Sequence, residues 1–541
     1  MKRPAKPIKL FGAGILALCL VGAGPATAQT GEGVASANPG KGKAKGKSKG
    51  KTQGKNFVPG SRSLGDPLFP QIGNGGYDAK HYKIAIDYDP AENRFRSAKA
   101  VMFAAAEQNL SSFSMDFQAL DVSRVRVDGR PAKFRQVEAT PDLSDNPDVT
   151  QPMKLVVKPA RGLHRGKRFK VRVDYAGVPE HITDPDTSIE GWIRACINPG
   201  FTPPCDGSHV VNEPIGAQSW FPSNNYPTDK ARFDTILVVP STHIAFGVGE
   251  LVQRRTKSGS TRWHWREDEP TATYLTTATV GLFDYTRTSM REGGNGRSIP
   301  IDRAIDSSYS AVQKQNVNES LDLIPDMHGF FANVYGRYPF DSTGAIVDRV
   351  PDVGYALEVQ TKSHFSRLGT TTNDISDSTL AHEIAHQWMG NAVTLARWND
   401  IWFNEGWATW SEWIWNNARA GGPSPAEIFD ELYADTPDEE WEVAPAVLDG
   451  DPSLLFSGFP QYDRGAMVIQ GTREIVGEDR FRFLIRVLMN DFRYGNISTE
   501  QFIGLVKRVS GFSGERRGRL DAFLRQWLYG ETKPTLLPED V

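Results

Sequence analysis

The sequence has 541 residues, of which 39% are hydrophobic, 10% aromatic and 23% charged. This composition excludes a disordered chain over most of the length, and the length exceeds the roughly 250–300 residues that one hydrophobic core supports. The first 55 residues hold eleven lysines and arginines and one glutamate, so the formal net charge of −3 becomes −13 for residues 56–541. This acidic body disfavours nucleic acid as a partner.

Residues 1–28 have the pattern of a cleaved signal peptide. A positively charged start precedes an apolar run, Leu10 to Gly24, and the small-residue site Ala26-Thr27-Ala28. Cys19 leaves a lipoprotein as the alternative, but Leu18 stands where a small residue would be needed. We therefore expect cleavage after residue 28 and a secreted, extracytoplasmic protein.

Residues 29–60 are predicted to form a disordered arm. Between residues 39 and 55 lysines alternate with small or polar residues, so little apolar surface is available to offset the entropy of ordering. The arm is either a solvated spacer or an electrostatic contact to an anionic cell surface.

Residues 61–285 are predicted to form a β-rich N-terminal domain. Apolar and polar residues alternate in Tyr82–Tyr88, Phe169–Tyr175 and Phe233–Val239, as in half-buried strands. Asp128-Gly129 and Ser258-Gly259 are typical turn pairs.

Two cysteines in this region, Cys196 and Cys205, flank a short loop rich in proline and glycine. In an exported protein so close a pair predicts a disulfide that closes a local hairpin, and two free thiols are the alternative.

Residues 286–541 are predicted to form a second, mainly helical domain. Helical spacing covers Ser307–Tyr335, Thr379–Gly390, Glu405–Ala418 and Asp463–Val476. The fold class is therefore α+β, with strands first and helices second.

The string His382-Glu383-Ile384-Ala385-His386 carries the chemistry. On a helix, residues four apart share a face, so the two histidines can bind one metal ion while Glu383 reaches a water molecule beside it. A catalytic zinc needs a third protein ligand, and Glu405 stands nineteen residues after His386 at the start of the next predicted helix. We expect one Zn²⁺ per chain; a chance histidine pair with a structural glutamate is the alternative.

HEIAHQWMG followed by WFNEGWA resembles the gluzincin zinc peptidases, and among them the aminopeptidase N family with its leukotriene hydrolase-type members. This resemblance implies a saddle-like β domain and a thermolysin-like catalytic domain, with peptides bearing a free N-terminus as substrates. By the same resemblance Tyr462, in QYDRGA, matches the tyrosine that stabilises the transition state. Glu213, in EPIGA, matches a residue that binds the substrate amine.

The chain also departs from the family pattern. In the family strand glycine-x-methionine-glutamate-asparagine, Glu358 keeps the carboxylate, whereas Leu357 replaces methionine and Val359 replaces asparagine. Only about eighty residues follow Tyr462, so we expect a short form without the large C-terminal helical domain and with a more open cleft.

These residues predict an aminopeptidase in which Glu383 acts as general base and Tyr462 stabilises the oxyanion, while Glu213 and Glu358 hold the substrate ammonium. Glu412 is a candidate acceptor for a zinc-binding histidine. A zinc endopeptidase or another hydrolase, such as one acting on an epoxide, is the second hypothesis. A cell-surface binding protein is the third.

Five tryptophans near the motif are expected to pack in the core rather than to contact substrate: Trp388, Trp402, Trp407, Trp410 and Trp413.

Overall fold

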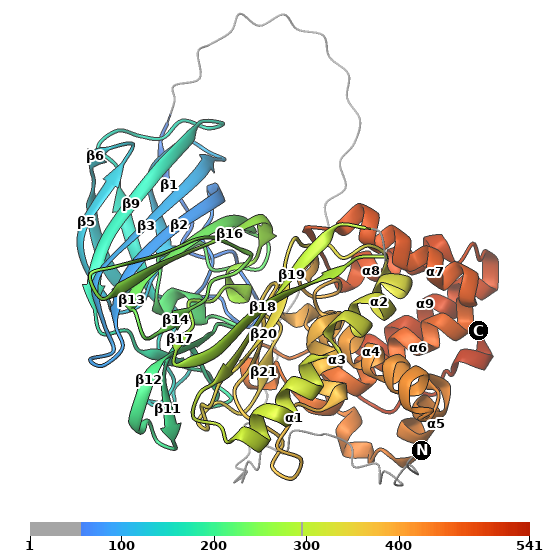
Figure 1. The fold of residues 1–541 in the computed structure, drawn as a ribbon. Coiled ribbons are helices and arrows are strands. Elements are labelled where there is room, and N and C mark those ends of the chain that lie inside the picture. The colour runs from blue at the N-terminus through green and yellow to red at the C-terminus, as the bar shows by residue number, and fades with distance from the viewer. Residues whose placement is uncertain (1–55, 294–295) are drawn as a thin grey trace, which may run out of the picture. The chain divides into compact units, whose positions relative to one another are not determined.

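The computed structural model describes residues 56–293 and 296–541. The predicted signal peptide and nearly all of the predicted arm lie outside the described residues. Phe57–Val541 form one compact unit, in which the β-rich part is coloured blue to green and helices α1–α9 yellow to red in Figure 1. Within the described part of the chain, no helix is both long and apolar enough to cross a bilayer.

Three sheets make up the β-rich part. The largest runs in the order β15 (Glu250–Lys257), β16 (Ser260–Thr271), β13 (Ala231–Pro240), β2 (Tyr77–Asp89), β3 (Arg94–Ala106), β9 (Arg168–Gly177), β5 (Asp121–Val127) and β6 (Arg130–Pro131). The second runs in the order β1 (Val58–Pro59), β4 (Leu110–Asp116), β8 (Met153–Lys158) and β7 (Lys133–Glu138). The third runs in the order β10 (His181–Thr183), β11 (Ile189–Asn198), β12 (Thr202–Val211), β17 (Val280–Gly281) and β14 (Ile244–Ala245).

The predicted alternation is confirmed in these strands. The three segments fall within β2, β9 and β13. The apolar side chains of β2 and β9 are buried on one face, whereas both faces of β13 are covered over residues 233–237. Asp128-Gly129 and Ser258-Gly259 all have positive φ angles, as a two-residue hairpin turn of the primed type requires. The arm predicted for residues 29–60 ends earlier than expected, because Val58 N donates to Asn109 O and β1 pairs with β4.

The helical part has a large hydrophobic core of its own and two further sheets. Its main sheet runs in the order β18 (Phe283–Arg291), β19 (Ser298–Asp306), β20 (Thr343–Val347), β22 (Ser363–Phe365) and β21 (Ala356–Leu357). A small parallel pair consists of β23 (Val393–Leu395) and β24 (Gly495–Ile497). The helices are α1 (Ala311–Leu321), α2 (Ile324–Tyr335), α3 (Asp377–Ala385), α4 (Trp402–Ala420), α5 (Pro425–Asp435), α6 (Arg464–Val476), α7 (Glu478–Val487), α8 (Thr499–Val509) and α9 (Gly514–Tyr529).

Three helical predictions need correction. The stretch Ser307–Tyr335 is two helices, since Pro325 lies in the first turn of α2 and the chain breaks after Leu321. Helix α3 ends at Ala385 rather than Gly390, because Gln387 N and Trp388 N donate to carbonyls three residues back, and Gly390 N donates forward to Val393 O. Helix α4 begins three residues before the predicted start at Glu405.

The two predicted domains share residues across their boundary at 285. That boundary falls inside β18, whose Phe283 belongs to the β-rich core while the strand pairs with β19. A separate apolar cluster joins both parts and includes Phe69, Tyr274 and Trp398. Beside it Asp66, which is 1% exposed, accepts hydrogen bonds from Trp398 N (3.1 Å) and Tyr226 Oη (2.8 Å) through one carboxylate oxygen.

Candidate active site

Helices α3 and α4 bring the three predicted metal ligands together. Ser376 caps α3 by accepting a hydrogen bond from Thr379 N, and His382 lies in the last turn of the helix. His386 follows as the next residue after Ala385 and keeps a helical conformation, so its ring stays on the face of His382. Glu405 lies in the first turn of α4, which packs against α3.

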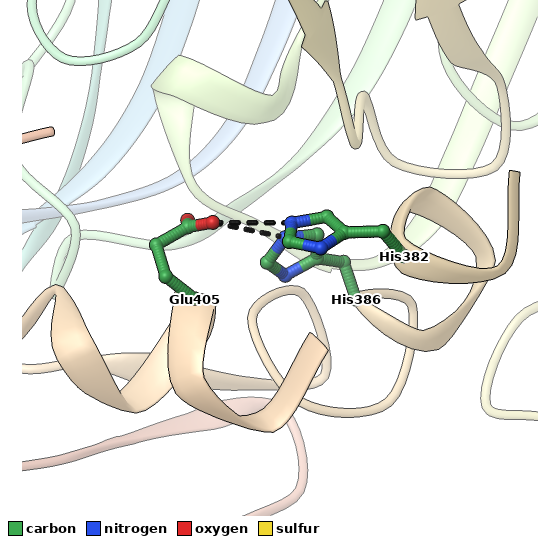
Figure 2. Close-up of side chains that lie close together, drawn as sticks. All are labelled: His382, His386 and Glu405. Atoms are coloured by element: carbon green, nitrogen blue, oxygen red, sulfur yellow. Dashed lines mark hydrogen bonds and ion pairs between the residues drawn. The ribbon is translucent and has the colours of Figure 1, made fainter. Parts of the chain in front are cut away.

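The ligand atoms of His382, His386 and Glu405 all lie within 4.8 Å of one another (Figure 2). Glu405 Oε2 is 3.2 Å from His382 Nε2 and 3.6 Å from His386 Nε2. All three side chains are at most 9% exposed. Two imidazole nitrogens and one carboxylate oxygen that face a common point form a donor set suited to a tetrahedral divalent cation.

The far nitrogens of both rings are held by acceptors. His382 Nδ1 lies 2.7 Å from Glu412 Oε1, and His386 Nδ1 lies 3.2 Å from Met389 O. A proton on each Nδ1 leaves a lone pair on each Nε2, as coordination of a metal requires. The position of Glu412 therefore agrees with its predicted role.

Two glycines allow the helices around the site to approach closely. A Cβ atom built on Gly406, next to Glu405, would lie 2.6 Å from the carbonyl carbon of Gly465 in α6. Because no larger residue fits this contact, α4 and α6 bring Glu405 close to Tyr462, which precedes α6. The ring of Tyr462 stacks at 6.0 Å from the ring of His382.

The charges of the ligand set depend on one another. Burial alone would raise the pKa of Glu405, but His386 and His382 lower it to about 2. Burial opposes the charged form of His382, yet its hydrogen bonds to Glu405 and Glu412 raise its pKa well above the ordinary value. The Glu405 carboxylate is therefore ionised at neutral pH, and a bound metal ion would displace the proton that His382 Nε2 shares with it.

Three further carboxyl groups are buried here without a complete set of partners. Glu213, Glu358 and Glu383 are 6%, 2% and 5% exposed, and each has one carboxyl oxygen without a hydrogen-bond partner among the described residues. Burial raises the pKa of Glu383 to about 8, and the two histidines oppose this shift only in part. Burial and the neighbouring Glu358 raise the pKa of Glu213. Such a cluster of acids favours cationic ligands.

Separate elements supply Glu213 and Glu358. Glu213 follows β12 and precedes a short 3₁₀ helix, Gly216–Ser219, and Glu190 Oε1 accepts a hydrogen bond from Ile215 N (2.9 Å) in this turn. Glu358 follows β21 at the edge of the main helical-part sheet. The structure thus brings all seven predicted site residues to one region, through contacts between residues far apart in the sequence.

The hairpin of β11 and β12 also contacts this region. Cys196 and Cys205 are paired across it with their sulfur atoms at bonding distance. At its tip, Gly200 N and Phe201 N donate to the carboxylate of Asp352 at 2.7 and 3.0 Å. The hairpin therefore holds the segment that leads into Glu358.

Several residues at the site had no signal in the sequence interpretation. Burial and the carboxyls of Glu213 and Glu358 raise the pKa of Tyr274, whose hydroxyl accepts a hydrogen bond from Asn404 Nδ2 (3.1 Å). Gln387 and Asn391 contact the main chain of Glu358. The one available hint was that these two residues follow His386 by one and five positions. The predicted packing of the motif tryptophans is confirmed, since all of them lie in the buried core of the helical part.

Two family models match the chain. The Peptidase M1 N-terminal domain matches residues 78–275, and the Peptidase family M1 domain matches residues 366–527. Among relatives, Aminopeptidase M1-B of Oryza sativa subsp. japonica is 28% identical over 323 residues, 55% of this chain and 35% of the relative. Aminopeptidase Ey of Gallus gallus is 24% identical over 418 residues, 72% of this chain and 41% of the relative. The chain thus spans well under half the length of these curated relatives.

Solved structures give matches over the whole of their own chains. An M1 zinc metallopeptidase mutant of Deinococcus radiodurans bound to a Tyr-Ser-Ala substrate is 25% identical with a TM-score of 0.73, and covers 88% of this chain and 100% of its own. A two-domain M1 zinc metallopeptidase mutant bound to L-arginine gives a TM-score of 0.74 at 25% identity, with the same coverage. The β-rich part followed by the helical part, the convergent donor set and both family models agree: the chain belongs to peptidase family M1.

Proposed function

We propose that this protein is a zinc-dependent aminopeptidase that removes N-terminal residues from peptides. The observation that carries the proposal is the convergence of His382, His386 and Glu405 on one point. A zinc ion held by these residues acts as a Lewis acid, which polarises the scissile carbonyl and makes water more acidic.

Glu383 is proposed as the general base. Its carboxyl is buried, lies one residue from His382 and has an oxygen without a partner. Because burial raises the pKa of this carboxyl, its ionised form is a stronger base than an ordinary glutamate, as proton transfer from the attacking water and on to the leaving amine requires.

Tyr462 is proposed to donate a hydrogen bond to the oxyanion of the tetrahedral state. Burial and the neighbouring Glu405 raise its pKa well above the ordinary value, so the phenol keeps its proton. This hydrogen bond accelerates the reaction because it is stronger to the developing negative charge in the transition state than to the carbonyl of the bound substrate.

Glu213 and Glu358 are proposed to bind the α-ammonium of the substrate. They are buried acids with unpartnered oxygens, and a cation with several N–H donors satisfies both. Solved relatives bound to a tripeptide substrate and to L-arginine support this class of ligand. The replacements Leu357 and Val359 keep an endopeptidase as the second candidate.

A paired set of substrates tests the proposal. Release of a chromophore should be at least about a hundredfold faster from a free aminoacyl amide than from its N-acetylated form. A chelator should abolish the reaction, added Zn²⁺ should restore it, and the E383Q variant should stay inactive with zinc bound. Equal rates on free and acetylated amides would refute the exopeptidase, and internal cuts in a protein digest would favour the endopeptidase.

We also propose export through the predicted signal peptide, with a disulfide between Cys196 and Cys205. The spacing of the two sulfur atoms supports the disulfide. Mass spectrometry of the mature protein tests both points, since a start at residue 29 and a mass two hydrogens below that of the dithiol are expected. The lysine-rich arm remains a proposed contact to anionic surfaces.

A further inference from the structure

Two amide side chains hold the main chain of Glu358. Gln387 Nε2 donates to Glu358 O at 3.1 Å and to Val359 O at 3.4 Å. Asn391 Nδ2 donates to the same Glu358 O at 2.7 Å. Both amides are almost completely buried, at 2% and 0% exposure.

The two amides bind a carbonyl that lies just beyond the end of the main sheet of the helical part. Strand β21 ends at Leu357, and its register with β22 covers only Ala356 and Leu357. The carbonyl of Glu358 therefore has no place in the strand ladder, and the two side-chain amides supply its donors. They follow the metal-binding His386 by one and five residues, so one short segment supports both the metal and the carboxylate.

The oxygen of the Gln387 amide contacts a residue with a strained backbone conformation. Gln387 Oε1 accepts a hydrogen bond from Thr361 N at 2.8 Å. Thr361 has φ 69, a left-handed conformation that β-branched residues rarely adopt, and its Oγ1 accepts a hydrogen bond from Gly249 N at 2.9 Å. Such strain persists only where the surroundings determine the backbone, and it is common beside binding sites.

We infer that Gln387 and Asn391 are positioning residues that set the distance from the metal-binding histidines to the Glu358 carboxylate. This inference rests on the proposed function, because that distance decides how many residues lie between the bound ammonium and the cleaved bond. Displacing a binding group by about 1 Å can reduce a rate by about a hundredfold. Loss of either amide should therefore weaken the preference for a free N-terminus.

Three variants test the inference. Gln387→Met keeps most of the side-chain volume and removes all the amide hydrogen bonds, while Asn391→Ala removes the second donor to Glu358 O. The matched control is Asn496→Ala, which removes an amide that donates to two main-chain carbonyls away from Glu358, Pro227 O (3.0 Å) and Leu395 O (2.8 Å). Each protein is measured for zinc content, for kcat/KM on a free and an N-acetylated aminoacyl amide, and for hydrogen exchange in residues 354–362.

Gln387→Met and Asn391→Ala should keep one zinc per chain and lower the ratio of free to acetylated kcat/KM by at least about tenfold. Hydrogen exchange in residues 354–362 should become faster in both. The double variant should lose less than the product of the single losses, since both amides bind one carbonyl. Asn496→Ala should keep the wild-type ratio and the wild-type exchange.

Two results would overturn the inference, and they differ. If the wild type prefers the free amide but the variants keep its ratio within about twofold, the positioning role is wrong and the proposed function stands. If the wild type itself treats both amides alike, the proposed function fails and the inference fails with it. Asn391→Ala removes one donor to Glu358 O and leaves the contacts of Gln387 in place, so it decides the matter alone if Gln387→Met does not fold.

Discussion

Arg464, the first residue of α6, is predicted to stabilise the region around Tyr462 through hydrogen bonds to the main chain. Its side chain is completely buried, and no acidic partner for it occurs among the ion pairs of residues 56–293 and 296–541. Burial lowers its pKa to about 10, so it stays charged at neutral pH. Its three nitrogens donate to five main-chain carbonyls, which are Trp527 O (3.0 Å), Trp441 O (3.1 Å), Val443 O (3.2 Å), Gln526 O (3.3 Å) and Gly530 O (2.6 Å).

Three of these carbonyls lie at the C-terminal end of α9, where a positive charge also interacts well with the helix dipole. A hydrogen bond to a charged group contributes about 1.5–3 kcal/mol net. Removing the guanidinium also removes its desolvation cost of several kcal/mol. We therefore expect Arg464→Met to lower the free energy of unfolding by about 3–5 kcal/mol. Arg464→Lys, which has three N–H donors for five carbonyls, should lower it by about 1–3 kcal/mol.

Urea unfolding followed by tryptophan fluorescence measures this difference, provided that the slope with urea is the same for all variants. The catalytic rate of folded Arg464→Met should also fall, because Tyr462 is only two residues away. A loss below about 1 kcal/mol in Arg464→Met would show that the five carbonyls find water or other donors, and would refute the reasoning.

Replacing Tyr462 by phenylalanine should lower kcat by about 10²–10³-fold with a smaller change in KM, and a rate within threefold of wild type would exclude the oxyanion role. Replacing Glu412 by alanine should weaken zinc binding by about 10–100-fold in competition with a chelator, since His382 Nδ1 loses its acceptor. Burial, with Glu412 nearby, raises the pKa of Asp463 to about 7, so the folded protein holds a proton that the unfolded chain releases near pH 4. Stability is therefore lost as the pH rises towards 7, and the stability of Asp463→Asn relative to wild type should increase from pH 5 to pH 8; urea midpoints that shift equally at both pH values would contradict this.

The sequence was informative where a short pattern determines the local structure. Alternation in Tyr82–Tyr88 predicts β2, because one face of that strand is buried. The spacing of His382 and His386 places two rings on one face, and that result holds although α3 ends before His386. Long periodic segments and short motifs were therefore predictable from neighbouring residues alone.

Tertiary contacts determine the rest. The break between α1 and α2 depends on Pro325, a local signal, yet its exact place depends on packing. The side-chain amide of Gln387 contacts a residue 29 positions away, and the guanidinium of Arg464 contacts residues up to 66 positions away. Nothing in the string around either residue indicates its partner, so such contacts emerge only from the folded chain.

Asp66 bears on how this protein should be shortened for experiments. The family match begins at residue 78, and a chain cut there would lack Asp66 together with the apolar side chains of Leu68, Phe69 and Ile72. Trp398 N would then have no acceptor just ahead of α4, the helix that carries Glu405. Recombinant versions that start at or before residue 57 should therefore fold and retain metal better than versions trimmed to the matched region.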